Sequence, residues 1–527
     1  MSVPRIETLE SLPLVDHHCH GLVRRELNRM DFERAMTEAD HPGPRGASFF
    51  DSQLGFALRR YCAPVLDLPA HALPDDYLAR RAELGADEVA SRMLRSAGIA
   101  DFCVDTGFAP ERLTSAADLA TAAGGRGHDV VRLEPLAEQV ALDIVTGQIG
   151  VAHFPDHVRA RLAARAAADG GSAGARPATG DSAPVVGVKS VAAYRVGLEL
   201  PAERPTDRVV IAAVRSWIGR LRAGAPIRLA DPVLHSFLIW AGADLGLPVQ
   251  IHTGYGDTDL HLRRANPLLL TDMLRALAST GAPVLLLHCY PFHREAGYLA
   301  QVFPHVYLDV GLATHNVGRA SATVLAEALE LAPFGKLLFS TDAFALAELY
   351  PLGARLFRRA LTALLAAGIA DGDWTADDAD RVAVMVGAGN ARRVYGLAEP
   401  AGGAEPEPTE ARAAKPRARA TGAGTKRRAA ARSSTAKPSA ERPAGTRRSA
   451  EKPARAETPA AKAPAEEPEA AEPAKAKPAA TKRPAGTAAR RNTAKRAPAK
   501  KAGPAKKEPA AKPAAARRPP KPPPDAS

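Results

Sequence analysis

Short apolar segments alternate with longer amphipathic stretches through the first 397 residues of this chain. Several of the short segments are continuously apolar, as strands buried on both faces must be. The longer stretches show helical periodicity, so the pattern is typical of parallel β/α architecture. Eight such units predict a closed (β/α)8 TIM barrel rather than an open sheet. The predicted strands are 13–18, 99–106, 129–136, 185–192, 248–253, 283–289, 306–311 and 337–341.

Helices are predicted between these strands, and glycines mark where several of them should end. The clearest helical stretches are 207–224, 231–246, 267–281, 321–332 and 348–368, with a last helix over 375–395. The predicted stops are Gly224, Gly246, Gly281 and Gly368. An insertion over 21–95, with helical pieces at 57–61 and 87–96, is expected to form a helical cap near the barrel mouth. Residues 169–184 are expected to be a flexible surface loop.

The composition divides the chain near residue 398. Residues 1–397 hold every Phe, Tyr and Trp and all four cysteines. Residues 401–527 carry 31 Lys and Arg against 12 Asp and Glu. A segment so poor in apolar side chains cannot bury enough surface to offset the entropy of ordering it. We therefore predict a folded domain over 1–397 and a disordered basic tail over 398–527.

The cysteines and the apolar runs indicate where such a protein would work. Cys19, Cys62, Cys103 and Cys289 show no paired spacing, and the first residues lack the apolar segment of a secretory signal. The sequence contains no run of about 18 or more apolar residues, so no membrane span is predicted. We expect a cytoplasmic protein with free thiols and no membrane partner. A homo-oligomer is compatible with the sequence.

A cluster of histidines follows the first predicted strand. Residues 14–21 read Leu-Val-Asp-His-His-Cys-His-Gly. Side chains two positions apart on a strand point to the same face, so His18 and His20 should project together. Two neutral imidazoles at the end of a strand make half of a divalent metal site.

Ionisable residues recur where the other predicted strands end, which is the face of a barrel where chemistry gathers. A single histidine in such a place is more often a hydrogen-bonded core residue, but a series in register indicates a metal site. Arg132, Lys189 and Arg195 would add positive charge around the barrel mouth. The strand-end residues are His18, His20, Asp105, Arg132, Glu134, Lys189, His252, His288, Asp309 and Asp342.

This set resembles the amidohydrolase superfamily of metal-dependent barrel enzymes, and most closely its amidohydrolase-2 branch. More narrowly, three segments resemble the amidohydrolase domain of FluG-type proteins, in which it is fused to a glutamine-synthetase-like domain that is absent here. The resemblance covers roughly residues 12–397. The motifs are Asp16-x-His18-x-His20, His252, His288 and Asp342, and the segments are 189–198, 250–260 and 389–397.

The resemblance implies that His18, His20, His252 and Asp342 hold one divalent ion. Nitrogen and carboxylate ligands suit Zn²⁺, with Mn²⁺ as the alternative, and a bound ion activates water at neutral pH. Asp342 is then expected to act as general acid and base. His288 is expected to polarise a substrate carbonyl or orient the water, and a role for it as a ligand stays open.

Further residues are expected to support the ligands or bind substrate. Asp16, Asp105 or Glu134 would accept the second N–H of a ligand histidine. Lys189 is expected to act as an ammonium near the substrate; in the alternative, a carboxylated Lys189 bridges two ions. Residues predicted to bind substrate are Arg195, Arg263 and Asp257.

The resulting hypothesis is a metal-dependent hydrolase of an amide-type C–N bond in a small carboxylate-bearing substrate. The resemblance to FluG-type proteins suggests a γ-glutamyl amide. A decarboxylase or a uronate-isomerase-like enzyme of the same superfamily is the alternative. In a different class, the basic tail predicts non-specific binding of DNA, RNA or other polyanions.

Overall fold

The structure is a computed structural model that describes residues 6–41, 43–109, 111–167 and 183–399. The described residues belong to one compact unit, which spans residues 1–414. The predicted flexible loop and the predicted basic tail fall almost wholly outside the described residues.

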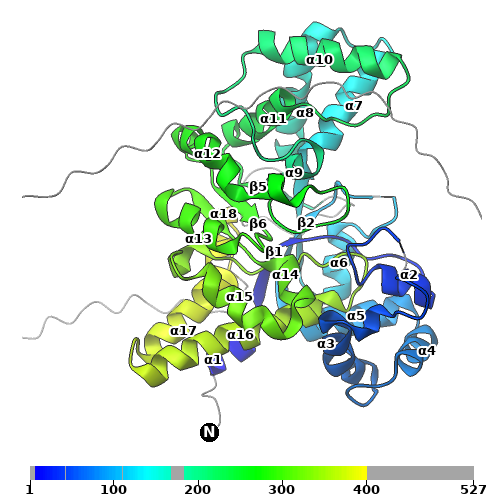
Figure 1. Cartoon of the computed structure of the whole chain (residues 1–527), viewed down its shortest axis with the longest axis vertical. Coiled ribbons are helices and arrows are strands. Elements are labelled where there is room, and N and C mark those ends of the chain that lie inside the picture. Colours follow the sequence, from blue (N-terminus) through cyan, green and yellow to red (C-terminus); the bar gives the residue numbers. More distant parts are fainter. Residues whose placement is uncertain (1–5, 42, 110, 168–182, 400–527) are drawn as a thin grey trace, which may run out of the picture. The chain divides into compact units, whose positions relative to one another are not determined.

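A parallel sheet lies at the centre of this unit, and each of its strands pairs with the next one along the chain (Figure 1). This order and direction confirm the predicted barrel-like β/α architecture. The strands are β1 Leu14–Cys19, β2 Ile99–Asp105, β3 Arg126–Arg132, β4 Val185–Ser190, β5 Val249–His252, β6 Val284–Leu287 and β7 Val306–Leu308.

The eighth predicted strand, 337–341, forms no regular strand but closes the sheet. Leu338 N–H donates to the carbonyl oxygen of Leu308 on one side, and His17 N–H donates to Phe339 on the other. The ladder is interrupted because the Asp16 carboxylate accepts the N–H and the hydroxyl of Thr341, at 2.9 and 2.5 Å. A side chain thus takes the place of a backbone partner, and the prediction of a regular strand is wrong for this reason.

Two other predicted boundaries are corrected. The sequence predicts the third strand over 129–136, but β3 ends at Arg132 and Glu134 lies in helix α7. Pro135 is tolerated in the first helical turn, where a backbone N–H has no partner within the helix. The sequence also predicts a helix end at Gly368, but α16 continues to Asp371 and stops at Gly372, whose φ of 77° is left-handed.

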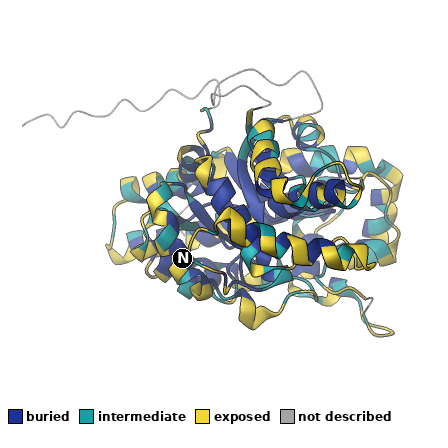
Figure 2. Ribbon diagram, turned by 90° about the horizontal axis from the view of Figure 1, so that it is seen from above, coloured by how far each residue is buried: buried dark blue, intermediate teal, exposed yellow. Residues whose placement is uncertain are grey.

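Helices surround the sheet and carry their apolar faces against it, so that buried residues gather at the centre and exposed ones on the outside (Figure 2). None of the helices in the described residues is long and apolar enough to cross a membrane. From β2 onward the helices are α6 Ala116–Ala123, α7 Leu133–Val145, α8 Phe154–Ala167, α9 Ala192–Arg195, α10 Asp207–Arg222, α11 Pro232–Asp244, α12 Thr271–Leu277, α13 His293–Val302, α14 Gly311–Asn316, α15 Ser321–Ala328 and α16 Leu349–Asp371.

Several helices lie between β1 and β2, in the predicted insertion. Arg81 of α4 pairs with the buried Glu348 at 2.7 Å, which fastens this region to the segment before α16. Removing either partner would leave a buried charge uncompensated. The helices are α2 Arg29–Arg34, α3 Gln53–Tyr61, α4 Pro74–Leu84 and α5 Ala86–Ala97, and α1 Glu7–Ser11 precedes β1.

The last predicted helix, 375–395, is interrupted by one π-helical stretch. Helix α17, Ala376–Val384, starts at a capping box between Thr375 and Asp378. The π segment Met385–Gly389 then leads into α18, Asn390–Tyr395. The Asn390 side chain donates to the carbonyl oxygens of Phe334 and Leu337, which anchors α18 beside the segment that closes the sheet.

Candidate metal centre

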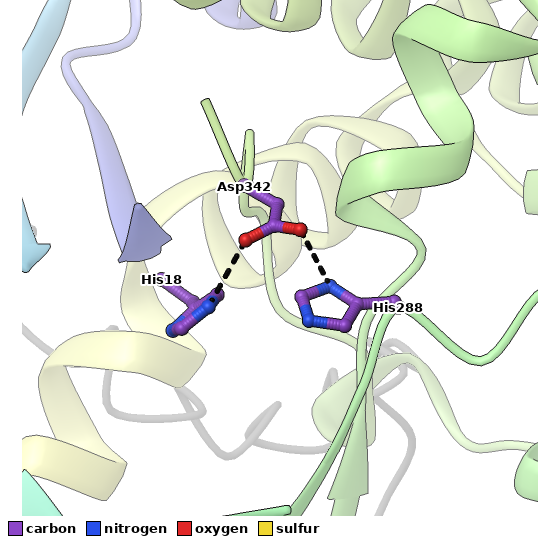
Figure 3. Close-up of side chains that lie close together, drawn as sticks. All are labelled: His18, His288 and Asp342. Carbon is purple, nitrogen blue, oxygen red and sulfur yellow. Dashed lines mark ion pairs between the residues drawn. The ribbon is translucent and has the colours of Figure 1, made fainter. Parts of the chain in front are cut away.

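Three side chains from widely separated parts of the chain converge at the carboxyl end of the sheet (Figure 3). Asp342 lies between two histidines: its Oδ1 is 3.1 Å from His18 Nε2, and its Oδ2 is 3.4 Å from His288 Nδ1. Asp342 follows the segment that closes the sheet, next to β1, because its N–H donates to the carbonyl oxygen of His18 at 3.0 Å. The closure of the sheet therefore brings the first and last predicted ligands together.

His20 joins this group from the loop after β1. Its Nε2 lies 3.4 Å from Asp342 Oδ1, and its Nδ1 lies 3.2 Å from the backbone carbonyl oxygen of Asp105. A carbonyl oxygen can only accept, so His20 Nδ1 carries the proton and Nε2 of the neutral ring is bare. That is the form of histidine that binds a metal ion.

A β-bulge shapes the end of β1. Between Asp16 and Cys19 the strand advances three residues while β2 advances two. Such a bulge changes the direction of side chains locally. It lets the neighbours His17 and His18 both bond to groups inside the barrel, where simple alternation would have placed them on opposite faces.

The carboxylates expected to support the ligand histidines do not do so. Asp16 bonds Thr341, and Glu134 accepts from the Ser190 hydroxyl and the Val191 N–H. The Asp105 carboxylate binds Arg132, and the hydrogen bond to His20 Nδ1 is made by the Asp105 backbone oxygen. The partner of His18 Nδ1 is instead the amide oxygen of Gln250, at 2.8 Å.

His252 ends β5 beside this group. Its ring centroid lies 4.7 Å from that of His288 and 4.4 Å from that of Tyr194. The ligand atoms of the described residues that lie within 4.8 Å of one another come from His18, His288 and Asp342, and from His18, His20 and Asp105. The assignment of His252 as a ligand therefore stays a prediction.

Two of the converging residues have strained backbones. His288 has a φ of 68° and Asp342 a φ of 49°, in the left-handed region that non-glycine residues rarely adopt. Each such residue costs on the order of 1–3 kcal/mol and persists where the surroundings hold it, commonly at functional sites. The N–H of His288 is held by Asp309 Oδ1 at 3.0 Å.

The electrostatics keep His18, His252 and His288 neutral and Asp342 ionised. Burial, with a contribution from the Lys189 ammonium, lowers the pKa of His18 to about 3. Burial also lowers the pKa of His288 to about 4 and that of His252 well below its usual value. Burial alone would raise the pKa of Asp342, but the neighbouring histidines hold it well below its ordinary range. At neutral pH the group has the charge states that metal ligands require.

Unpaired polar atoms at this site fit a divalent ion. His252 Nε2, His288 Nδ1 and Asp342 Oδ1 are buried and make no hydrogen bond with any described residue. Buried polar atoms are rarely left without a partner, because each costs about 1–3 kcal/mol. Imidazole nitrogens and a carboxylate oxygen are also the donors that Zn²⁺ prefers.

Lys189 lies inside the group rather than at its edge. Its side chain is buried, and Nζ is 3.3 Å from His18 Nε2, the atom expected to bind the ion. Burial lowers the pKa of Lys189 to about 8, although the carboxylates of Asp105 and Asp342 act in the opposite direction. The position agrees with both predicted roles of this residue, as an ammonium and as a carboxylated bridge.

A cavity of about 550 Å³ opens over the group and is lined by His20, Lys189, His252, His288 and Asp342 at its base. Two of the predicted substrate-binding residues, Arg195 and Asp257, line it as well. Arg263, the third, is exposed and is not among the described residues that line the cavity.

Other residues lining the cavity are absent from the site predicted from the sequence. Glu38, from the segment after α2, and the buried His315 of α14 both line it. Neither follows an apolar strand, so the strand-end pattern could not find them. Arg132, which the sequence does place at a strand end by the barrel mouth, lines the cavity as well, with its guanidinium bonded to Asp105 and 5.2 Å from the ring centroid of Phe108.

Known proteins resemble this chain in sequence and in fold. Protein fluG from Emericella nidulans is 34% identical over 282 residues, which cover 51% of this chain. The chain covers only 32% of that relative's length. A solved structure from Lactobacillus casei ATCC 334, named provisionally as a metal-dependent hydrolase, is 29% identical with a TM-score of 0.61. The aligned region covers 96% of that structure's chain and 74% of this chain.

A solved uronate isomerase from Bacillus halodurans C-125 is 12% identical with a TM-score of 0.48, covering 75% of this chain and 96% of that one. The amidohydrolase family model matches residues 15–397, which is well over half of the chain and includes every residue of the converging group. The resemblance predicted from the strand-end residues is thereby confirmed, and the chain belongs to the amidohydrolase family.

Proposed function

We propose that this amidohydrolase hydrolyses an amide-type C–N bond in a small carboxylate-bearing molecule. One divalent ion, Zn²⁺ rather than Mn²⁺, would be held by His18, His20, His252 and Asp342. The observation that carries the proposal is the convergence of histidines on an ionised Asp342 at a cavity whose lining includes Arg132, Lys189 and Arg195.

The residues at the base of the cavity support the chemistry of hydrolysis. A bound divalent ion would supply Lewis-acid activation of water at neutral pH. The Asp342 carboxylate is ionised and can accept the proton of the attacking water as the C–O bond forms. It can then return this proton to the leaving nitrogen as the C–N bond breaks. His288, beside Asp342 Oδ2, is suited to orient the carbonyl group or the water.

The wall of the cavity supports a carboxylate on the substrate. Three basic residues line the cavity: Arg132 at the end of β3, Lys189 in β4 and Arg195 at the end of α9. Arg132 is bonded to Asp105 and Arg195 is paired with Glu138 at 3.4 Å, so both guanidinium groups are oriented before substrate binds. Guanidinium groups bind carboxylates with defined geometry.

The test combines metal analysis with a substrate screen on the full chain. We expect a metal-to-protein ratio near one and release of an amine from γ-glutamyl amides or N-acyl amino acids. Asp342→Asn should lower kcat/KM by about 10²–10⁴-fold, because general acid–base catalysis contributes on this scale. Asp272→Asn, at an exposed carboxylate on α12, is the control and should keep the wild-type rate.

Other outcomes separate the alternatives. Release of CO₂ or conversion of a uronate, without amine, would contradict the proposal in favour of a decarboxylase or an isomerase. A metal-to-protein ratio near two would support a carboxylated Lys189 that bridges two ions. A purified protein without metal that takes none up would contradict metal-dependent catalysis altogether.

A further inference from the structure

Tyr395, the last residue of α18, reaches into the barrel beside Gln250, whose amide oxygen bonds the predicted ligand His18. It belongs to the segment 389–397, to which the proposed function assigns no role. The Tyr395 side chain is buried, and its hydroxyl oxygen lies 2.8 Å from Gln250 Nε2 and 3.1 Å from His17 Nδ1. A hydroxyl group from the final helix therefore takes part in the polar network behind the site.

The orientation of the Gln250 amide is fixed by its partners. Gln250 Nε2 lies 2.8 Å from the backbone carbonyl oxygen of His17, which can only accept a hydrogen bond. The amide nitrogen must therefore face this oxygen, and a flipped amide would place two acceptors against each other. The second N–H of the same nitrogen donates to the Tyr395 hydroxyl.

This orientation decides which nitrogen of His18 carries a proton. The amide oxygen of Gln250 lies 2.8 Å from His18 Nδ1 and can only accept, so Nδ1 must donate. The neutral ring then has no proton on Nε2, which faces Asp342 Oδ1 at 3.1 Å. Two acceptor atoms at this separation repel each other unless a cation binds both of them. In the other tautomer Nε2–H would donate to Asp342, and the site would be closed to the ion.

The network continues from Tyr395 to the second half of the site. Since the Tyr395 oxygen accepts from Gln250, its own proton is available to His17 Nδ1. The proton of His17 then lies on Nε2, which is 3.1 Å from Asp309 Oδ2. Asp309 in turn accepts the N–H of His288 and holds its left-handed backbone. Tyr395 thus connects to His18 in one direction and to His288 in the other.

We propose that Gln250 and Tyr395 are positioning residues that hold His18 in the tautomer whose bare Nε2 binds the divalent ion. Helix α18 then takes part in metal binding, although none of its residues is a predicted ligand. The proposal rests on the proposed function, because it takes His18 as a ligand.

The test measures Zn²⁺ affinity of the full chain, stripped of metal, by competition with a chromophoric chelator at fixed pH. Gln250→Leu removes the acceptor for His18 and should weaken the Zn²⁺ Kd by about 10–100-fold, the usual effect of losing a partner of a ligand histidine. Tyr395→Phe removes one hydroxyl and should weaken it by about tenfold. Tyr395→Phe keeps the aromatic ring and its packing, so this variant still tests the inference if Gln250→Leu does not fold.

Two further variants separate positioning from stability. Tyr77→Phe is the matched control, because Tyr77 is equally buried and its hydroxyl bonds Glu348 at 3.1 Å, away from the converging group. It should lower Tm and leave the Zn²⁺ Kd unchanged. Gln250→Glu keeps an oxygen for His18 but places a second one against the His17 carbonyl, so it should lower Tm and keep a Kd near that of the wild type.

The outcomes discriminate between the inference and the proposed function. Wild-type affinity in both Tyr395→Phe and Gln250→Leu would overturn the inference. The inference would also be overturned if the Zn²⁺ Kd rose in proportion to the loss of Tm in all four variants, the Tyr77→Phe control included. A wild-type protein that takes up no Zn²⁺ would overturn the proposed function itself, and the inference with it.

Discussion

Glu38 is one of three acidic residues of the insertion that line the cavity, together with Asp31 and Asp40. Burial, together with the nearby carboxylates of Asp342 and Asp257, raises its pKa from 4.5 to about 7. The folded state therefore binds a proton on Glu38 more tightly than the unfolded chain does. The contribution of Glu38 to folding stability must fall as pH rises from about 4.5 to about 7, because the fold then has to accommodate the ionised form.

Replacing this carboxyl group by a neutral amide should remove that penalty. Glu38→Gln, measured with a chelator present so that Asp342 carries no ion, should have nearly the wild-type Tm at pH 4.5. At pH 8 its Tm should exceed that of the wild type. Thermal melts across this range test the prediction. Glu111→Gln, at an exposed carboxylate, controls for the loss of one negative charge. A difference in Tm that does not vary with pH would contradict ionisation of Glu38 as the cause.

At the scale of single elements, the end of α16 shows why a glycine is not always a stop. Gly368 lies in the helix, and a Cβ atom there would lie 2.1 Å from the ring of Trp374. The Trp374 indole N–H donates to the carbonyl oxygen of Leu365 at 2.9 Å and so folds back over the last turns. Gly368 is therefore required for close packing, and the left-handed stop falls at Gly372.

The two kinds of helical glycine should respond in opposite directions to alanine. Gly368→Ala should lower the free energy of unfolding by about 1–3 kcal/mol, because the indole ring must move. Gly219→Ala, in α10, meets no atom within 4 Å and should raise it by about 0.5–1 kcal/mol through helix propensity. Urea unfolding of both variants measures the difference. A stabilising effect at Gly368 would contradict the packing role of this glycine.

At the scale of the whole molecule, the repeating apolar segments are sufficient to predict a parallel β/α barrel. Strand positions follow because a buried parallel strand must be apolar on both faces. The irregular eighth segment could not be predicted, since its ladder is replaced by the Asp16 carboxylate, a contact across more than three hundred residues. The prediction that a helix ends at Gly368 is wrong for a similar reason, because Trp374, which packs against Gly368, lies beyond the end of α16.

The sequence predicts those site residues that lie at the end of a strand or directly beyond it. His18, His20, His288 and Asp342 lie there, and the structure brings them together. Gln250 and Tyr395 act through hydrogen bonds whose direction depends on tertiary structure, and no local pattern reveals them. The bulge that lets the neighbours His17 and His18 both face the inside of the barrel is likewise absent from the alternating pattern of the strand.

The basic tail makes a prediction about the full chain. Residues 401–527 carry an excess of 19 positive charges, while the rest of the chain has a net negative charge. Full-length protein should bind heparin and elute at higher salt than a 1–399 truncation, because polyanion binding of this kind depends on released counterions. Equal elution would contradict polyanion binding by the tail. The truncation should keep the catalytic rate of the full chain, since the described site lies within 6–399.

The closure of the sheet by the segment that carries Asp342 has a consequence for biosynthesis. During translation His18 and His20 leave the ribosome long before Asp342, and Tyr395 emerges later still. The imidazoles of His18 and His20 are therefore available in a nascent chain before the carboxylate of Asp342 is present, so the complete set of proposed ligands does not yet exist. Under the proposed function, metal binding is then completed late, and products of premature termination before residue 342 should be purified without the ion.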